Sequence, residues 1–67
     1  MDKVLVLVPV VVTLNPLHMS DVKGMELDVL YTYSQTTTRD GQKYIFIDQV
    51  KHWYRKEYFK DQDIILN

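Results

Sequence analysis

The sequence predicts an α+β fold in which one C-terminal helix packs on a small, mainly antiparallel sheet of three to four strands. Three observations predict this fold. A run of β-branched residues opens the chain, an Asp-Gly dipeptide separates two further strand-like segments, and the next segment sorts its residues at a helical period. With 67 residues, the chain is expected to form a single domain over residues 1–67.

The first strand is expected over about residues 3–13, where valine predominates. Alternate side chains of this strand face one way: Val4, Val6, Val8, Val10 and Val12. The opposite side is apolar as well, so we expect both faces to be covered. Pro9 has no N–H to donate and predicts a strand edge or a bulge. Because apolar edges pair with other chains, the five valines form a predicted self-association strand.

A connector and a hairpin are expected next. Residues 15–24 are predicted to form the connector, with Ser20 or Asp21 capping a short helical turn that ends at Gly24. Strands over about 26–37 and 43–47 then flank Asp40-Gly41, a dipeptide that favours a two-residue hairpin turn.

The hairpin is expected to carry an aromatic face. A turn at Asp40-Gly41 places Thr37 opposite Tyr44 and Gln35 opposite Phe46. Four aromatic side chains then share one face: Tyr31, Tyr33, Tyr44 and Phe46. Such a face can stack bases, as in sheet-based RNA binders, or lie half-buried under the first strand or in a dimer.

The helix is expected over about residues 49–60, capped by Asp48. At a helical period, Trp53 and its apolar neighbours fall on one arc, which is expected to pack on the sheet. The opposite arc is basic, with one phenylalanine in its middle, and is the predicted partner-binding face: Lys51, His52, Arg55, Lys56, Phe59 and Lys60. Phe59 either docks under the C-terminal apolar residues or is the apolar centre of a binding surface. A short closing strand over 63–66 is a further candidate.

Catalytic and cofactor chemistry find little support in the sequence. There is no cysteine, which excludes disulfides and thiolate metal sites. The two histidines, His18 and His52, lie far apart, and no glycine-rich phosphate loop occurs. We therefore expect no enzyme activity, no metal and no cofactor.

Size and charge favour a binding protein. A domain of 67 residues has a small core and gains from a partner subunit. The formal net charge of −1 argues against a whole-molecule grip on nucleic acid. The first hypothesis is a non-enzymatic protein-binding module, a small inhibitor, adaptor or regulator, that forms homo-oligomers, with a dimer favoured. The alternatives are a nucleic-acid-binding protein using the basic face of the helix 49–60, and a structural subunit of a larger assembly.

Origin and location complete the expectations. The chain has six lysines, two arginines and no alanine, a bias typical of an AT-rich genome. Such a genome belongs to a low-GC bacterium, or to a phage or mobile element that lives in one. The apolar run from Val4 to Leu14 is about half the roughly 20 residues that a membrane-spanning helix needs. The leading "MDK" lacks the charge of a signal peptide. We expect no membrane span and a cytoplasmic protein, in its own organism or in an infected host cell.

Overall fold

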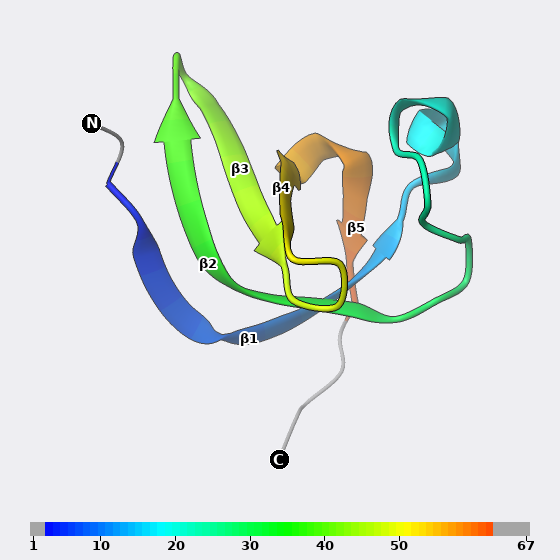
Figure 1. Ribbon diagram of the computed structural model, residues 1–67, viewed down its shortest axis with the longest axis horizontal. Coiled ribbons are helices and arrows are strands. Elements are labelled where there is room, and N and C mark those ends of the chain that lie inside the picture. The colour runs from blue at the N-terminus through cyan, green and yellow to red at the C-terminus, as the bar shows by residue number, and fades with distance from the viewer. Residues whose placement is uncertain (1–2, 63–67) are drawn as a thin grey trace.

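The computed structural model describes residues 3–62, and these form a curled antiparallel sheet of five strands. The strands are β1 (Leu5–Leu14), β2 (Tyr31–Arg39), β3 (Gln42–Ile47), β4 (His52–Arg55) and β5 (Phe59–Asp61). Two 3-10 helices, η1 (Pro16–Asp21) and η2 (Lys56–Tyr58), are the only helical segments within residues 3–62. The order across the sheet is β4-β3-β2-β1-β5, so the fifth strand returns to pair with the first (Figure 1).

The predicted α+β fold is therefore wrong, because residues 49–60 do not form a helix. The chain turns over residues 48–51, runs as β4, turns again through η2 and enters β5. In β4, Trp53 lies opposite Phe46 and Tyr54 lies opposite Ile45, so the two aromatic residues face opposite sides of the sheet. The η2 turn then changes which side of the sheet the following side chains face. Over a turn, a short strand and a 3-10 helix taken together, the apolar residues therefore recur at a spacing that resembles a helical period.

Side chains from the turn after β3 explain why the chain reverses there. Asp48 Oδ2 accepts a hydrogen bond from Thr32 Oγ1 at 3.1 Å. Gln49 accepts from Thr32 N at 2.9 Å and donates to Thr32 Oγ1 at 2.8 Å. These contacts bind the turn to β2, and Lys51, with φ of 55°, completes it in the left-handed region. Long-range contacts thus override the helical preference of the sequence.

The hairpin between β2 and β3 confirms the predicted Asp40-Gly41 turn. Both residues have positive φ, 52° and 78°, as a type I′ turn requires. Thr37 lies opposite Tyr44, as expected. The second strand is shorter at its start than predicted, since it begins at Tyr31 rather than near residue 26.

A bulge in β2 divides the predicted aromatic face. The register shifts between Tyr33 and Thr36, so Tyr33 lies opposite Ile47. One extra residue reverses the side to which all following side chains point. Tyr31 and Tyr33 are consequently buried with Ile45 and Ile47, whereas Tyr44 and Phe46 are half-buried on the other side of the sheet.

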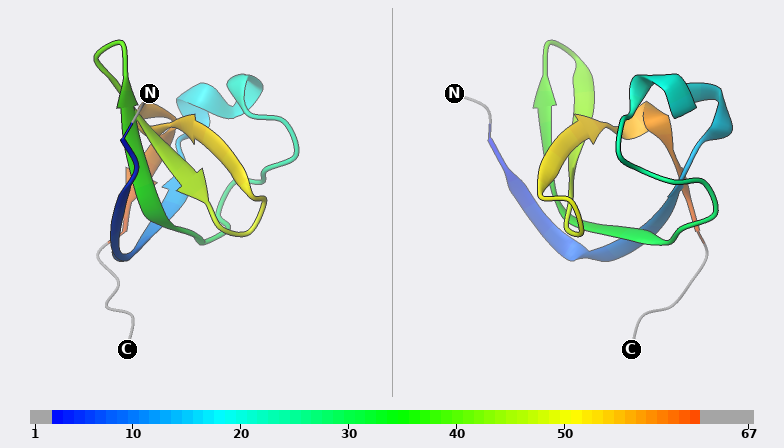
Figure 2. Two further views of the ribbon diagram at one scale, coloured as in Figure 1. Left: turned by 60° about the vertical axis from the view of Figure 1, so that its left-hand side comes forward. Right: turned by 45° about the vertical axis from the view of Figure 1, so that its right-hand side comes forward.

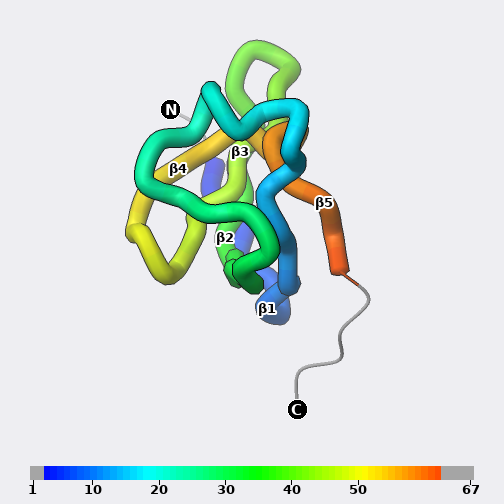
Figure 3. Tube along the Cα trace, turned by 90° about the vertical axis from the view of Figure 1, so that its right-hand side faces the viewer, coloured from blue at the N-terminus to red at the C-terminus, as the bar shows by residue number. Residues whose placement is uncertain are grey.

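The core lies inside the curl of the sheet. Its buried members are Val12, Leu14, Val22, Met25, Tyr31, Tyr33, Ile45, Ile47 and Phe59. Val22 and Met25 come from the connector between β1 and β2, which lies over one end of the curled sheet (Figure 3). Burying such a side chain contributes about 1.5–3 kcal/mol. The connector thus takes the covering role that the sequence assigned to a helix.

The connector contains the expected helical turn, but another residue caps it. Asn15 Oδ1 accepts a hydrogen bond from Leu17 N at 3.1 Å, and Pro16 occupies the first position of η1. The expected caps, Ser20 and Asp21, lie at the other end of η1. The predicted closing strand over 63–66 lies outside the described residues.

Pro9 marks a break in β1, as predicted. The pairing of β1 with β2 shifts between Val6 and Val10. Beyond this bulge, Val12, Thr13 and Leu14 pair with β5 on the other edge. β1 therefore consists of a buried C-terminal half and an N-terminal half that reaches beyond β5 (Figure 1).

Candidate functional site

Val4 and the first four residues of β1 form a run of five consecutive exposed apolar residues, Val4–Val8, here called the exposed half-strand. Val6 is 78% exposed and Val8 is 80% exposed. The expectation that this strand is covered on both faces is therefore wrong for Val4–Val8 and holds only for its C-terminal half. Val10 is half-buried and Val12 is fully buried, so the five predicted valines divide between surface and core.

One edge of the exposed half-strand has no neighbouring strand among residues 3–62. On its other edge, Leu5 lies opposite Thr36 and Val6 opposite Gln35 of β2. β5 reaches only as far along β1 as Val12 (Figure 2). The start of the half-strand is nevertheless fixed, because Thr37 Oγ1 donates a hydrogen bond to Lys3 O at 2.9 Å. The apolar residues are thus held in place on a sheet edge that no strand within residues 3–62 covers.

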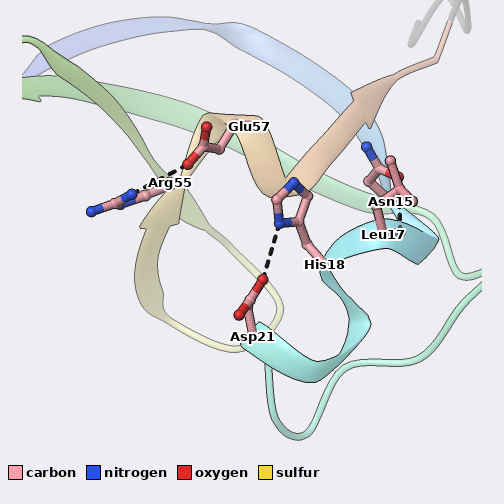
Figure 4. A network of polar contacts seen from close by, with 6 residues as sticks. All are labelled: Asn15, Leu17, His18, Asp21, Arg55 and Glu57. Atoms are coloured by element: carbon pink, nitrogen blue, oxygen red, sulfur yellow. Dashed lines mark hydrogen bonds and ion pairs between the residues drawn. The ribbon is translucent and has the colours of Figure 1, made fainter.

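The predicted basic face is dispersed over three elements. Lys51 lies in the turn before β4, His52 and Arg55 lie at the two ends of β4, Lys56 begins η2 and Lys60 lies in β5. Lys56 Nζ pairs with Asp61 Oδ1 at 3.0 Å. Arg55 Nη1 pairs with Glu57 Oε1 at 3.3 Å (Figure 4). The structure does not bring these side chains together on one surface.

Phe59 belongs to the core. Its side chain is 6% exposed, and its ring packs edge-on against Tyr54, with ring centroids 5.9 Å apart. This burial does not fit the surface alternative for Phe59, and the C-terminal apolar residues of the docked alternative lie outside the described residues. Within the described residues, Phe59 contacts Tyr54 and belongs to the core of the curled sheet. The sequence had placed Phe59 and Tyr54 on different faces of a helix.

A second surface feature lies on the outside of the curled sheet. Tyr44, Phe46 and Trp53 are half-buried there, and we call them the outer aromatic face. The rings of Phe46 and Trp53 meet edge to face, with centroids 5.3 Å apart. Val4, Thr37, Arg39, Tyr44 and Trp53 line an open groove of about 320 Å³ on this side.

Sequence reasoning missed Trp53 in this groove, because Trp53 was assigned to the arc of a helix that packs on the sheet. The strict alternation of Tyr44, Ile45, Phe46 and Ile47 already indicates that β3 has one aromatic and one aliphatic side. The pairing of β3 with β4, which brings Trp53 beside Phe46, is a non-local fact that no local pattern reveals.

Two groups have shifted pKa values. A hydrogen bond to the Tyr44 side chain, aided by one to Glu57, raises the pKa of Arg55. Because an arginine guanidinium is always charged in proteins, Arg55 places a positive charge beside the outer aromatic face. Burial raises the pKa of Tyr33, with Asp61 acting in the same direction and Lys56 opposing it.

His18 contacts Asp21 of η1 and Tyr58 of η2. Its Nδ1 lies 3.0 Å from Asp21 Oδ2 (Figure 4), and its ring lies 5.0 Å from that of Tyr58, measured between centroids. Within residues 3–62, no three His, Asp or Glu side chains are grouped as metal ligands. No helix in the same range has the length and apolar character needed to cross a membrane.

No family model, no curated protein and no solved structure matches the chain. A small curled sheet is compatible with many functions, so the function has to be argued from the surface features themselves.

Proposed function

We propose that the protein is a non-enzymatic protein-binding module, a small inhibitor, adaptor or regulator, that self-associates through the exposed half-strand. One observation carries the proposal: Val4–Val8 are exposed on a strand edge that no other described strand covers. Unpaired backbone groups on such an edge are a template for another strand. Contiguous apolar surface on a soluble protein marks sites of association.

A second copy of the chain fits this edge. Antiparallel pairing about a two-fold axis places the same strand opposite itself. When the pairing is centred on Val6, Val4 lies opposite Val8, and Lys3 does not lie opposite the Lys3 of the other copy. The paired residues carry no charge, so no like charges meet. Added burial suits a chain of 67 residues, whose own core is small.

The test is the mass of the protein in solution. We expect the wild type to sediment as a dimer at micromolar concentrations, and the double variant Val6→Lys/Val8→Lys to sediment as a monomer with an unchanged far-ultraviolet circular dichroism spectrum. Charged side chains on an edge strand prevent pairing, and these positions do not contribute to the core.

Leu17→Lys is the matched control, because Leu17 is 85% exposed but lies in η1, away from the strand edge. This variant is expected to remain a dimer. A wild type that is monomeric throughout the micromolar range contradicts the proposal. Open polymers instead of a dimer favour a structural subunit of a larger assembly. The nucleic-acid hypothesis based on a helix over 49–60 is withdrawn, because that helix does not form.

A further inference from the structure

The rings of the outer aromatic face lie on β3 and β4, which β2 separates from β1, although Val4 of the exposed half-strand also lines the groove. This surface has the features of a second binding site. Across the sheet, Thr37 lies opposite Tyr44, and Tyr44 lies opposite Arg55, so these three side chains form one row. In the neighbouring row, Phe46 lies opposite Trp53. Neighbouring strands are about 4.8 Å apart, so the rows form one continuous surface.

Arginine stands on both sides of the aromatic residues. Arg39 follows Thr37 by two positions in β2, which puts both on the same side of the sheet, and both line the groove with Tyr44 and Trp53. Arg55 lies at the far end of the row, and a hydrogen bond to the Tyr44 side chain is the largest cause of its raised pKa. A guanidinium presents five N–H donors, so Arg55 retains donors beyond those that contact Glu57 and Tyr44.

The lining of the first groove carries a positive charge, that of Arg39, although the whole chain has a net charge of −1. A second groove beside β1 is lined by Lys3, Leu5, Leu7, Thr36, Thr37, Thr38 and Lys43. In the described chain, neither groove has an Asp or Glu among its lining residues. Asp40 next to Arg39, and Glu57 paired with Arg55, offset part of this charge from outside the grooves. Most of the side chains of β2 and β3 that line this second groove, Thr36, Thr38 and Lys43, alternate with Thr37 and Tyr44 and therefore lie on the other side of the sheet.

We propose that the outer aromatic face binds single-stranded nucleic acid, with a base in the groove between Tyr44 and Trp53 and backbone phosphates at Arg39 and Arg55. Aromatic side chains stack on bases of any sequence, and basic residues beside them follow the backbone. The groove, at about 320 Å³, lies at the small end of ligand sites. A duplex hides the faces of its bases, so a single strand fits this surface. An acidic peptide would satisfy the arginines but would leave the aromatic rings without a planar partner.

Trp53 makes the test direct, because it is the only tryptophan of the chain. We expect short oligothymidine and oligouridine to quench Trp53 fluorescence in a saturable way at about 50 mM salt. Two phosphate contacts predict a slope of about −1.4 in a plot of log affinity against log salt, at about −0.7 for each phosphate of a single strand.

Variants separate stacking from charge. Tyr44→Leu is expected to weaken binding about tenfold, while Tyr44→Phe, which keeps the ring, retains the affinity. Arg39→Gln should weaken binding and reduce the salt slope by about half. Lys60→Gln is the matched control, because it removes one charge from an exposed position in β5 and is expected to leave binding unchanged.

Three results overturn the proposal. The first is no quenching by either oligonucleotide at about 50 mM salt. The second is equal loss of affinity in Lys60→Gln and Arg39→Gln, which would mean general attraction without a site. The third is quenching by oligoglutamate at the same concentrations, which would assign the surface to an acidic protein instead. Self-association is measured by mass and this site by fluorescence, so either proposal can fail alone.

Discussion

Tyr33 illustrates at the scale of one residue how a bulge determines what a side chain does. The hairpin register predicted from the turn alone put Tyr33 on a face with Tyr44 and Phe46. The bulge between Tyr33 and Thr36 turns it inward, where it is 3% exposed. A phenol surrounded by core atoms resists ionisation, and burial therefore raises the pKa of Tyr33.

This shift predicts how stability depends on alkaline pH. A raised pKa in the folded state means that the folded protein holds the phenol proton more tightly than the unfolded chain does. The stabilisation is complete below the unfolded pKa of about 10 and is lost as the pH rises above it. We expect the free energy of unfolding in urea to fall more steeply in the wild type than in Tyr33→Phe between about pH 9 and pH 11. Parallel pH profiles for the two proteins would show that Tyr33 has no such role.

At the scale of the elements, the strands with local signals were predictable and those without were not. The valine-rich run, the Asp-Gly turn and the strand after it carry their own patterns, and they match β1, the hairpin turn and β3. β4 has four residues between a turn and η2, too few to show an alternation. Its position depends on its pairing with β3 and on the contacts of Gln49 with Thr32, which are distant in sequence.

The sequence indicated some members of each candidate site but not all of them. The valines of β1 were correctly singled out as an unusual apolar set, but their exposure depends on where β5 ends. Two members of the outer aromatic face, Tyr44 and Phe46, belonged to the aromatic face that the sequence predicted. Trp53 joins them only because β4 is a strand, and Tyr31 and Tyr33 leave them because of the bulge.

Phe59 attaches β5 to the core, so replacing it tests how much this strand contributes to the stability of the protein. Phe59 lies opposite Leu14 of β1 and packs on Tyr54. Replacing a buried phenylalanine with alanine costs about 3–5 kcal/mol. A chain of this size has a stability of roughly 3–10 kcal/mol, at about 0.05–0.15 kcal/mol per residue. We therefore expect Phe59→Ala to be largely unfolded in thermal denaturation followed by circular dichroism.

Phe59→Leu is the control for this prediction, because it keeps most of the buried volume and is expected to stay folded with a lowered Tm. A Phe59→Ala protein with the stability of the wild type would mean that β5 contributes nothing to the core. It would also favour a role for Phe59 in a binding surface, which its burial argues against.

At the scale of the whole molecule, the core and the apolar surface lie on different parts of β1. Val12 and Leu14 are buried between β2 and β5, whereas Val6 and Val8 lie on an edge beyond them. The same strand therefore contributes to the fold at one end and offers apolar surface at the other. If that surface pairs with a second copy, folding and association are thermodynamically linked, because only the folded chain presents the edge.

This linkage predicts a Tm that depends on protein concentration. For a dimer that dissociates on unfolding, a hundredfold rise in concentration stabilises each protomer by half of RT ln 100, or about 1.4 kcal/mol. In a domain of this size that corresponds to a rise in Tm of about 5–10 °C. Scanning calorimetry of the wild type should show this rise, and Val6→Lys/Val8→Lys should show a constant Tm. A constant Tm in the wild type over the same range would mean that the exposed half-strand does not hold two copies together, because a monomer unfolds independently of its concentration.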